Sequence, residues 1–200
     1  GYCGIDVIGS TSLPDSMQGD LVIGDYKKNQ ISRFHLEEEG AGYRVVWKEP
    51  LIKSSHRNFR PVDVKLGPDG AVYVVDWYNP ITCHQDDFYR HPNRDMTHGR
   101  IWRVSKVNGN HGKSGLYRWG NKRLFESLKS DNRWIRFKAK QVLSSRNLQS
   151  IPSFVFKYEG RDLIELASLV DMLQLANKDL IYKMMQSGDH RVRAYGARMI

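Results

Sequence analysis

Hydrophobic and polar positions alternate through most of residues 1–106, which predicts a series of short β-strands. Two β-branched runs, at 62–64 and 71–77, flank Pro68, Asp69 and Gly70. Pro fixes one backbone dihedral and Gly accepts a positive one, so these residues predict a tight turn and an antiparallel hairpin. A third strand is predicted over 100–105, after a long polar loop.

The same pattern occurs once earlier in the chain, with a longer turn. The runs at 5–8, 20–26 and 30–34 match those at 62–64, 71–77 and 100–104. The match places Asp6 on Asp63, Asp25 on Asp76 and Arg33 on Arg103, and residues 43–52 would add an outer fourth strand to the first copy. A repeat of a few antiparallel strands, each closing on a polar residue, is typical of β-propeller blades.

After a linker at 107–118, rich in Gly and Asn, the hydrophobic period changes from two residues to three or four. Residues 181–200 repeat the pattern of 124–143, with a hydrophobic residue followed by arginine at Arg136 and again at Arg193. Another amphipathic helix is predicted over 161–176. We expect residues 119–200 to form helical repeats of HEAT or armadillo type, with Asp or Asn capping the helices.

The charge of the chain changes at the same linker. The net charge is +9, but residues 1–107 hold 14 Lys and Arg against 14 Asp and Glu, whereas residues 108–200 hold 17 against 8. No run approaches the roughly 18 apolar residues of a membrane span, and no signal peptide is visible. Because the chain begins without Met and stops within a predicted helix, we interpret it as a piece of a longer polypeptide.

Four basic residues fall at helical spacing on one side of the helical part: Lys129, Arg133, Arg136 and Lys140. They predict either a docking surface for an acidic partner or an ordinary solvated face, in which Arg136 and Arg193 brace neighbouring repeats. The acidic partner would be a protein or a polysaccharide, and we do not expect nucleic acid.

The two cysteines, Cys3 and Cys83, are too few for a disulfide scaffold. In a propeller, both would lie on one face in adjacent blades. Either a disulfide or two free thiols fits that placement, and the disulfide would require an oxidising compartment.

Candidate chemistry gathers where the predicted strands begin and end. Arg60 precedes an inner strand, Asp76, Trp77 and Tyr78 follow the second strand, and Arg100 starts the third. A propeller would bring these five residues to one rim around its central channel. Two simpler roles remain open: Asp76 would cap backbone amides of the next turn, and Arg60 would form an ion pair with Asp76.

The loop at 79–99 is dense in ionisable groups and longer than a structural connection needs. Three interpretations apply to His84 and His98. Either could act as a general base on a substrate hydroxyl. Either could bind a metal together with Asp86 or Asp95, although no recognised ligand spacing is present. In the third interpretation, Asp95, His98 and Arg100 only anchor the loop by hydrogen bonds and ion pairs.

Four motifs together resemble a known family: 59–65 (FRPVDVK), 67–73 (GPDGAVY), 76–80 (DWYNP) and 95–104 (DMTHGRIWRV). They look like the membrane-bound dehydrogenase-type proteins of planctomycete-type and Bacteroidetes bacteria, relatives of the soluble quinoprotein glucose/sorbosone dehydrogenases. The likeness extends from Gly1 to about Lys106, and the helical tail agrees with the HEAT-like array that follows the propeller in that family.

The resemblance implies the last one or two blades of a six-bladed β-propeller, located in the periplasm or cell envelope. It implies oxidation of a sugar or related alcohol with pyrroloquinoline quinone (PQQ) and calcium, and electron transfer to a cytochrome c domain. Arg60 and Arg100, with Asp76, Trp77 and Tyr78, are the implied cofactor-binding residues. The sequence has no Cys-x-x-Cys-His haem site, only Cys83 followed by His84, and this piece alone is expected to be inactive. The alternative is a non-catalytic scaffold of propeller and helical repeats that binds polysaccharide or a partner protein.

Overall fold

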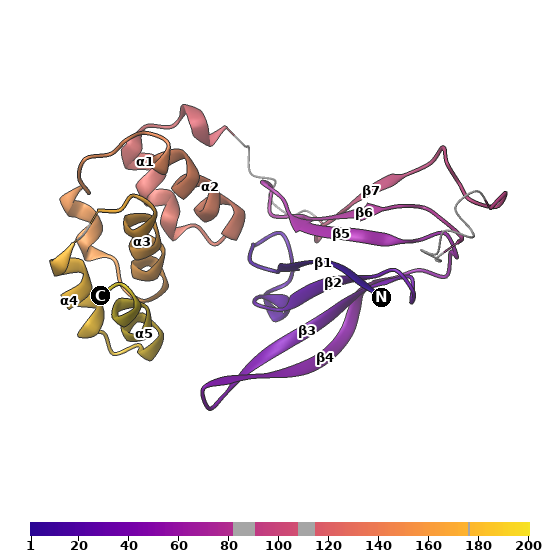
Figure 1. The fold of residues 1–200 in the computed structure, drawn as a ribbon, viewed down its shortest axis with the longest axis horizontal. Helices are drawn as coiled ribbons and strands as arrows, with labels where there is room; N and C mark the ends of the chain where they lie inside the picture. The colour runs from indigo at the N-terminus through magenta and orange to yellow at the C-terminus, as the bar shows by residue number, and fades with distance from the viewer. Residues whose placement is uncertain (82–90, 108–114, 176) are drawn as a thin grey trace. The chain divides into compact units, whose positions relative to one another are not determined.

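The computed structural model describes residues 1–81, 91–107, 115–175 and 177–200 (Figure 1). The chain divides into two compact units, Gly1–Lys113 and Ser114–Ile200. The described part of the first unit is built of β-strands and that of the second of helices, so the chain is a mixed β plus α protein. None of the described helices is both long and apolar enough to cross a membrane.

The first unit holds two antiparallel sheets. The four-stranded sheet runs in the order β1 (Tyr2–Val7), β2 (Leu21–Asp25), β3 (Gln30–Glu39) and β4 (Gly42–Lys53). The three-stranded sheet runs in the order β5 (Pro61–Leu66), β6 (Val72–Asp76) and β7 (Arg100–Val104). A short 3-10 helix, Asp15–Met17, lies between β1 and β2. The predicted hairpin, the third strand and the outer fourth strand of the first copy are all confirmed.

Strand register confirms most of the internal repeat. Asp25 lies opposite Gln30 at the end of β2, as Asp76 lies opposite Arg100 at the end of β6. Arg33 of β3 and Arg103 of β7 also occupy matching positions. Arg33 pairs with the residue three before Asp25, and Arg103 pairs with the residue three before Asp76. The two copies therefore share one arrangement of their second and third strands.

The predicted match of Asp6 with Asp63 is wrong. Asp6 lies opposite Val22, which is three residues before Asp25. Asp63 lies opposite Val75, which is only one residue before Asp76, so the two aspartates do not occupy the same position. Each inner strand has a register shift, and the shift after Cys3 leaves Gly4 as the extra residue. An alignment without gaps cannot reveal such bulges.

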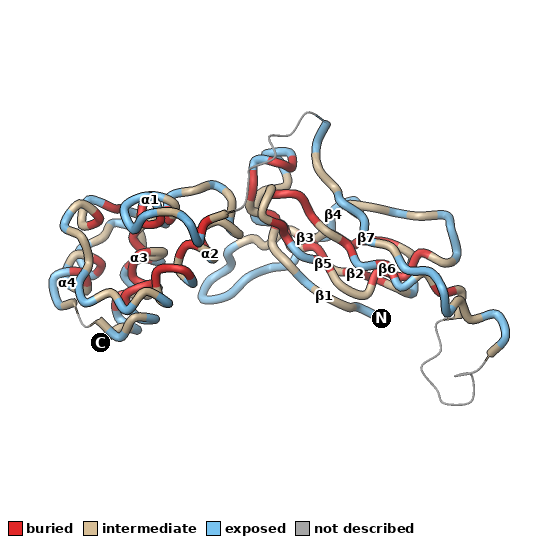
Figure 2. The backbone as a smooth tube through the Cα atoms, turned by 90° about the horizontal axis from the view of Figure 1, so that it is seen from above, coloured by how far each residue is buried: buried red, intermediate tan, exposed pale blue. Residues whose placement is uncertain are grey.

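The two sheets pack through their inner strands, because β1 and β2 both lie against β5. Side chains of Val22, Ile31, Val64 and Val74 are fully buried. Buried segments follow β2, β5 and β6 (Figure 2). Gly4 has φ +63°, and a Cβ atom there would lie 2.3 Å from Asp63 Oδ1, so glycine allows the backbones of β1 and β5 to approach closely.

The second unit is helical. Its α-helices are α1 (Asn121–Glu126), α2 (Arg133–Ser144), α3 (Gly160–Met172), α4 (Lys178–Met185) and α5 (His190–Arg198). Short 3-10 helices span Leu116–Arg118, Ser127–Lys129 and Ser153–Lys157. The side chains of Asn132, Asn177 and Asp189 cap α2, α4 and α5, as Asp or Asn was expected to do. Helix α3 ends four residues before the predicted boundary, and Gln174 then takes the left-handed conformation with φ 54°.

The helical unit also repeats itself. The Arg136 guanidinium donates to the carbonyls of Ser130 and Asp131, and that of Arg193 donates to the carbonyls of Ser187 and Gly188. Each arginine thus closes the turn before its own helix. A single core joins the helices, with Leu124, Leu143, Leu166 and Leu180 fully buried.

Candidate functional site

A buried carboxylate at the end of β6 gathers most of the predicted site residues. Asp76 is 1% exposed, and its Oδ1 accepts hydrogen bonds from the amides of Arg60 at 2.8 Å and Tyr78 at 2.9 Å. Its Oδ2 accepts from Arg100 Nε at 2.8 Å and from Trp102 Nε1 at 2.9 Å. Arg100 Nη2 lies 2.7 Å from the same oxygen. We call Arg60, Asp76, Tyr78, Arg100 and Trp102 the Asp76 cluster.

Strand pairing explains why the cluster forms. Asp76 lies opposite Pro61 at the start of β5 and opposite Arg100 at the start of β7. The segment before β5, the end of β6 and the start of β7 therefore meet at one end of the sheet. The structure brings the Asp76 and Arg100 side chains together as predicted, whereas Arg60 reaches Asp76 through its backbone amide. Trp77 is adjacent, but its ring lies 5.9 Å from the guanidinium of Arg94 and makes none of the Asp76 contacts.

The cluster keeps its carboxylate ionised. Burial alone would raise the pKa of Asp76. Hydrogen bonds from the Arg60 amide, the Trp102 indole, the Tyr78 amide and the Arg100 side chain outweigh burial and lower the pKa below its ordinary value. The capping role expected for Asp76 is confirmed, since two of its donors are backbone amides of neighbouring turns.

Arg60 is a buried cation whose contacts differ from the expected ion pair. Its backbone amide bonds to Asp76, but its guanidinium donates to the carbonyls of Tyr26, Phe59 and Pro80. The residue is 6% exposed, and its Nε donates to none of the described residues. Burial and the nearby charge of Arg57 lower the pKa of Arg60, while Asp76 opposes the shift. Asp76 therefore forms its ion pair with Arg100, and Arg60 adds a buried positive charge nearby.

Aromatic rings hold the guanidinium of Arg100 in place. Its Cζ lies 4.1 Å from the centroid of Tyr78 and 4.9 Å from that of Trp102. Tyr78 also stacks on His56, with ring centroids 5.6 Å apart. Tyr78 has φ 53°, a strained conformation for a residue with a side chain, and such strain concentrates at functional sites. Arg100 Nη1 bonds to none of the described residues, so one edge of a fixed guanidinium is available to an anion.

His98 and Asp95 form an exposed pair beside Tyr78. His98 Nδ1 lies 2.8 Å from Asp95 Oδ2, and the His98 and Tyr78 rings meet edge to face at 5.7 Å. The pKa of Asp95 is lowered to about 2, chiefly by a hydrogen bond from the Thr97 amide. Burial acts in the opposite direction, and a hydrogen bond with the His98 side chain lowers the pKa further. An ionised Asp95 orients the imidazole with Nε2 as its second nitrogen, which is the arrangement a general base needs. The other predicted histidine, His84, lies outside the described residues.

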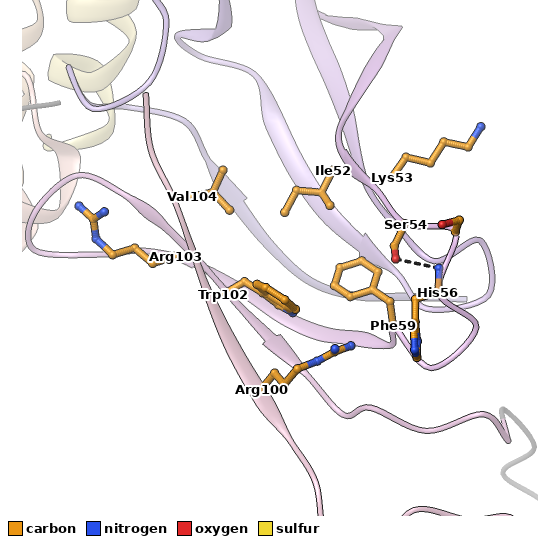
Figure 3. Close-up of a pocket in the computed structure, with 10 residues that line it drawn as sticks. Ile52, Lys53, Ser54, His56, Phe59, Arg100, Trp102, Arg103 and Val104 are labelled. Carbon is orange, nitrogen blue, oxygen red and sulfur yellow. Dashed lines mark hydrogen bonds between the residues drawn. The ribbon is translucent and has the colours of Figure 1, made fainter. Parts of the chain in front are cut away.

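A cavity of about 410 Å³ adjoins the cluster. It lies between the end of β4 with the following loop and strand β7, and its lining combines apolar and basic side chains. Figure 3 shows the Arg100 side chain extending from β7 toward Phe59 and His56. Trp102, which belongs to the Asp76 cluster, also lines the cavity.

The described residues do not fit calcium. They contain no group of three or more His, Cys, Asp or Glu side chains that could hold a metal ion. The Asp76 oxygens already accept hydrogen bonds from several N–H donors, so this carboxylate has no free position for a metal ion. Arg100 is a side chain that could bind a carboxylate group of an anionic ligand such as the quinone. Cys83, which would pair with Cys3 in the disulfide alternative, lies outside the described residues.

The predicted basic face of the helical unit is partly structural. Arg136 Nε and Lys140 Nζ donate to the two oxygens of Glu165 on α3, at 2.7 Å and 2.6 Å. Burial would raise the pKa of Glu165, but these two cations lower it. Lys129 lies 5.5 Å from the ring of Tyr158. Two of the four residues therefore pair with a single carboxylate within the unit, which supports the bracing role that was the alternative for Arg136.

Sequence reasoning missed two members of this region. Trp102 lies two residues after Arg100 on the same strand and thus on the same face, so the alternation of the strand could have identified it. His56 comes from the loop before β5 and stacks on Tyr78 through a contact distant in sequence. No local pattern indicates His56.

A family model described as a domain of unknown function, DUF7133, matches residues 1–108. No curated protein and no solved structure matches the chain.

Proposed function

The chain belongs to the DUF7133 family, and we propose that it is part of a quinoprotein-like dehydrogenase that oxidises sugars or related alcohols. Residues 1–106 would be the last one or two blades of a six-bladed propeller, followed after a linker by HEAT-like helical repeats over 119–200. The protein would act in the periplasm or cell envelope and pass electrons to a cytochrome. One observation carries the proposal: a positively charged, aromatic-lined cluster lies beside a histidine oriented by a carboxylate.

Each residue has a defined task in this proposal. Arg100, fixed between Tyr78 and Trp102, binds a carboxylate of the quinone with its free edge. Arg60 supplies a second positive charge from a buried position and so favours an anion in the cluster. His98 accepts the proton of the substrate hydroxyl at Nε2, and Asp95 stabilises the imidazolium that results. A quinone held by Arg100 would supply the acceptor for the hydride that leaves the substrate carbon.

The test uses the full-length protein supplied with PQQ and calcium. We expect sugar-dependent reduction of a dye, and His98→Gln should lower kcat about a hundredfold or more, as the loss of a general base does, with little change in KM. His91→Gln in the same loop is the matched control and should retain activity. Full activity of His98→Gln would remove His98 from the reaction, and absence of any activity in the wild-type protein would refute the dehydrogenase proposal.

A non-catalytic scaffold is the second candidate, favoured by the complete satisfaction of Asp76 and Glu165 within the protein. Such a scaffold would bind a polysaccharide or a partner protein. Glycan binding without dye reduction, measured on the same full-length preparation, would support the scaffold.

A further inference from the structure

The outer edge of β7 is open. Strand β7 pairs with β6 on one side, and no strand of the described residues pairs with its other side. Ile101 is 72% exposed and Trp102 is 43% exposed. An exposed strand edge with apolar side chains is a template for pairing with another extended segment.

The internal repeat indicates what belongs beside β7. In the first sheet, β3 occupies the position that β7 occupies in the second, and β4 covers the outer edge of β3. Among the described residues no strand takes the corresponding place beside β7, and after this strand the Lys106 amide donates to the Ser12 carbonyl at 2.8 Å. The place beside β7 is therefore open to another extended segment.

The cavity beside this edge has the chemistry of a side-chain pocket. Ile52, Phe59, Trp102 and Val104 give it apolar walls contributed by both sheets. Its volume of about 410 Å³ is in the range of binding pockets and is large enough for an aromatic side chain. Figure 3 shows the Trp102 and Phe59 rings on opposite sides of this space.

The rim of the cavity is basic. Lys53, His56, Arg100 and Arg103 contribute to it. Arg100 and Arg103 are balanced by Asp76 and Asp69, whereas Lys53 forms no ion pair with the described residues. An acidic side chain is therefore the complement of Lys53.

We propose that β7 and the adjacent cavity bind an extended polypeptide strand, with one large apolar side chain in the cavity and acidic side chains next to Lys53. Backbone hydrogen bonds to β7 supply the affinity, and the pocket and the rim charge supply the specificity. The cavity shares Arg100 and Trp102 with the Asp76 cluster, but strand binding is measured without quinone or substrate, so its failure is distinguishable from failure of the proposed activity.

The probe is a short peptide in which glutamate and valine alternate around one tryptophan. Calorimetry measures its binding to the chain of residues 1–200, and hydrogen exchange locates the bound strand. We expect slower amide exchange across Arg100–Val104 and no binding of a control peptide that is N-methylated at alternate residues, because methylation removes the backbone donors. Equal binding of both peptides, no binding at millimolar peptide, or unchanged exchange in β7 would overturn the proposal.

Two variants test the pocket and the rim. Ile52→Trp fills the cavity and should weaken binding about tenfold, an effect of one large buried apolar contact. Lys53→Glu should weaken binding about fivefold, since an exposed attraction becomes a repulsion. Lys48→Glu is the matched control, because Lys48 is exposed on the same strand but does not line the cavity, and it should leave binding unchanged. Equal losses for the two lysine variants, or no loss for Ile52→Trp, would count against the site. Dimerisation of the chain without peptide, through the same edge, would show that a second copy is the occupant and would also overturn it.

Discussion

Replacing Asp76 with asparagine tests how strongly the cluster depends on one charge. The substitution keeps the shape of the side chain but removes its negative charge from a position that is 1% exposed. The new amide group would face N–H donors where a carboxylate oxygen now accepts from Arg100 and Trp102. Arg100 would then lose its ion-pair partner, and the buried Arg60 would lose the nearby negative charge.

Removing one partner of a fully buried ion pair costs about 3–5 kcal/mol. Arg100 is 31% exposed at its side chain, so solvent screens part of its lost interaction, and we expect the lower end, about 3 kcal/mol. Asp25→Asn is the matched control at the same position of the first repeat. Asp25 is 2% exposed and accepts one backbone amide, that of Lys28, so its loss should cost about 1 kcal/mol.

Hydrogen exchange measured by mass spectrometry is the suitable assay, because a chain of two units does not unfold as one two-state system. Amides of β5, β6 and β7 should exchange about a hundredfold faster in Asp76→Asn, which corresponds to about 3 kcal/mol. The pKa of Asp76 is lowered by folding, so the stabilisation by its carboxylate is complete above the unfolded pKa of about 3.9 and is lost as the pH falls through the folded value. The difference between variant and wild type should therefore narrow below about pH 4. Equal effects of the two substitutions, or a difference that does not depend on pH, would refute this reasoning.

Two further substitutions have controls within the chain. Gly4→Ala should destabilise the first unit by about 3 kcal/mol, because it combines a positive φ with a Cβ atom 2.3 Å from Asp63 Oδ1, whereas Gly40→Ala, with φ +59° and open space, should cost about 1 kcal/mol. Similar costs for the two alanines, measured by hydrogen exchange of the first unit, would contradict the close approach of β1 and β5. Glu165→Gln should destabilise the helical unit by about 3 kcal/mol, because Arg136 and Lys140 lose their shared anion, while the exposed Glu126→Gln should stay within about 0.5 kcal/mol. Hydrogen exchange in the helical unit that matches the wild type for both variants would show that the Glu165 contacts contribute nothing.

Local patterns were sufficient for most of the elements. Alternation at Val72–Asp76 and turn residues at 68–70 act between near neighbours, and the structure follows them. The helical caps at Asn132 and Asp189 are equally local. The predicted end of α3 lies beyond the observed end, because the apolar spacing continues past Met172. The helix stops before Gln174, which takes the left-handed backbone conformation.

Contacts between distant segments could not be predicted in the same way. The guanidinium of Arg60 bonds to carbonyls of Tyr26 and Pro80, and neither loop carries a sequence signal for that role. Helical spacing placed Arg136 and Lys140 on one face, but only the tertiary packing of α3 brings Glu165 to them. The convergence on Asp76 was predictable because strand ends in an antiparallel meander meet at one end of the sheet.

Binding of PQQ to the full-length protein tests the central claim most directly. Calorimetry should show saturable binding that weakens at least tenfold in Arg100→Lys, because lysine cannot keep both the Asp76 contact and the bidentate geometry of the guanidinium. Arg103→Lys on the same strand, where the arginine is bound to Asp69, should bind the quinone as the wild type does. No binding, or equal binding by all three proteins, would contradict the assignment of the Asp76 cluster as the cofactor site.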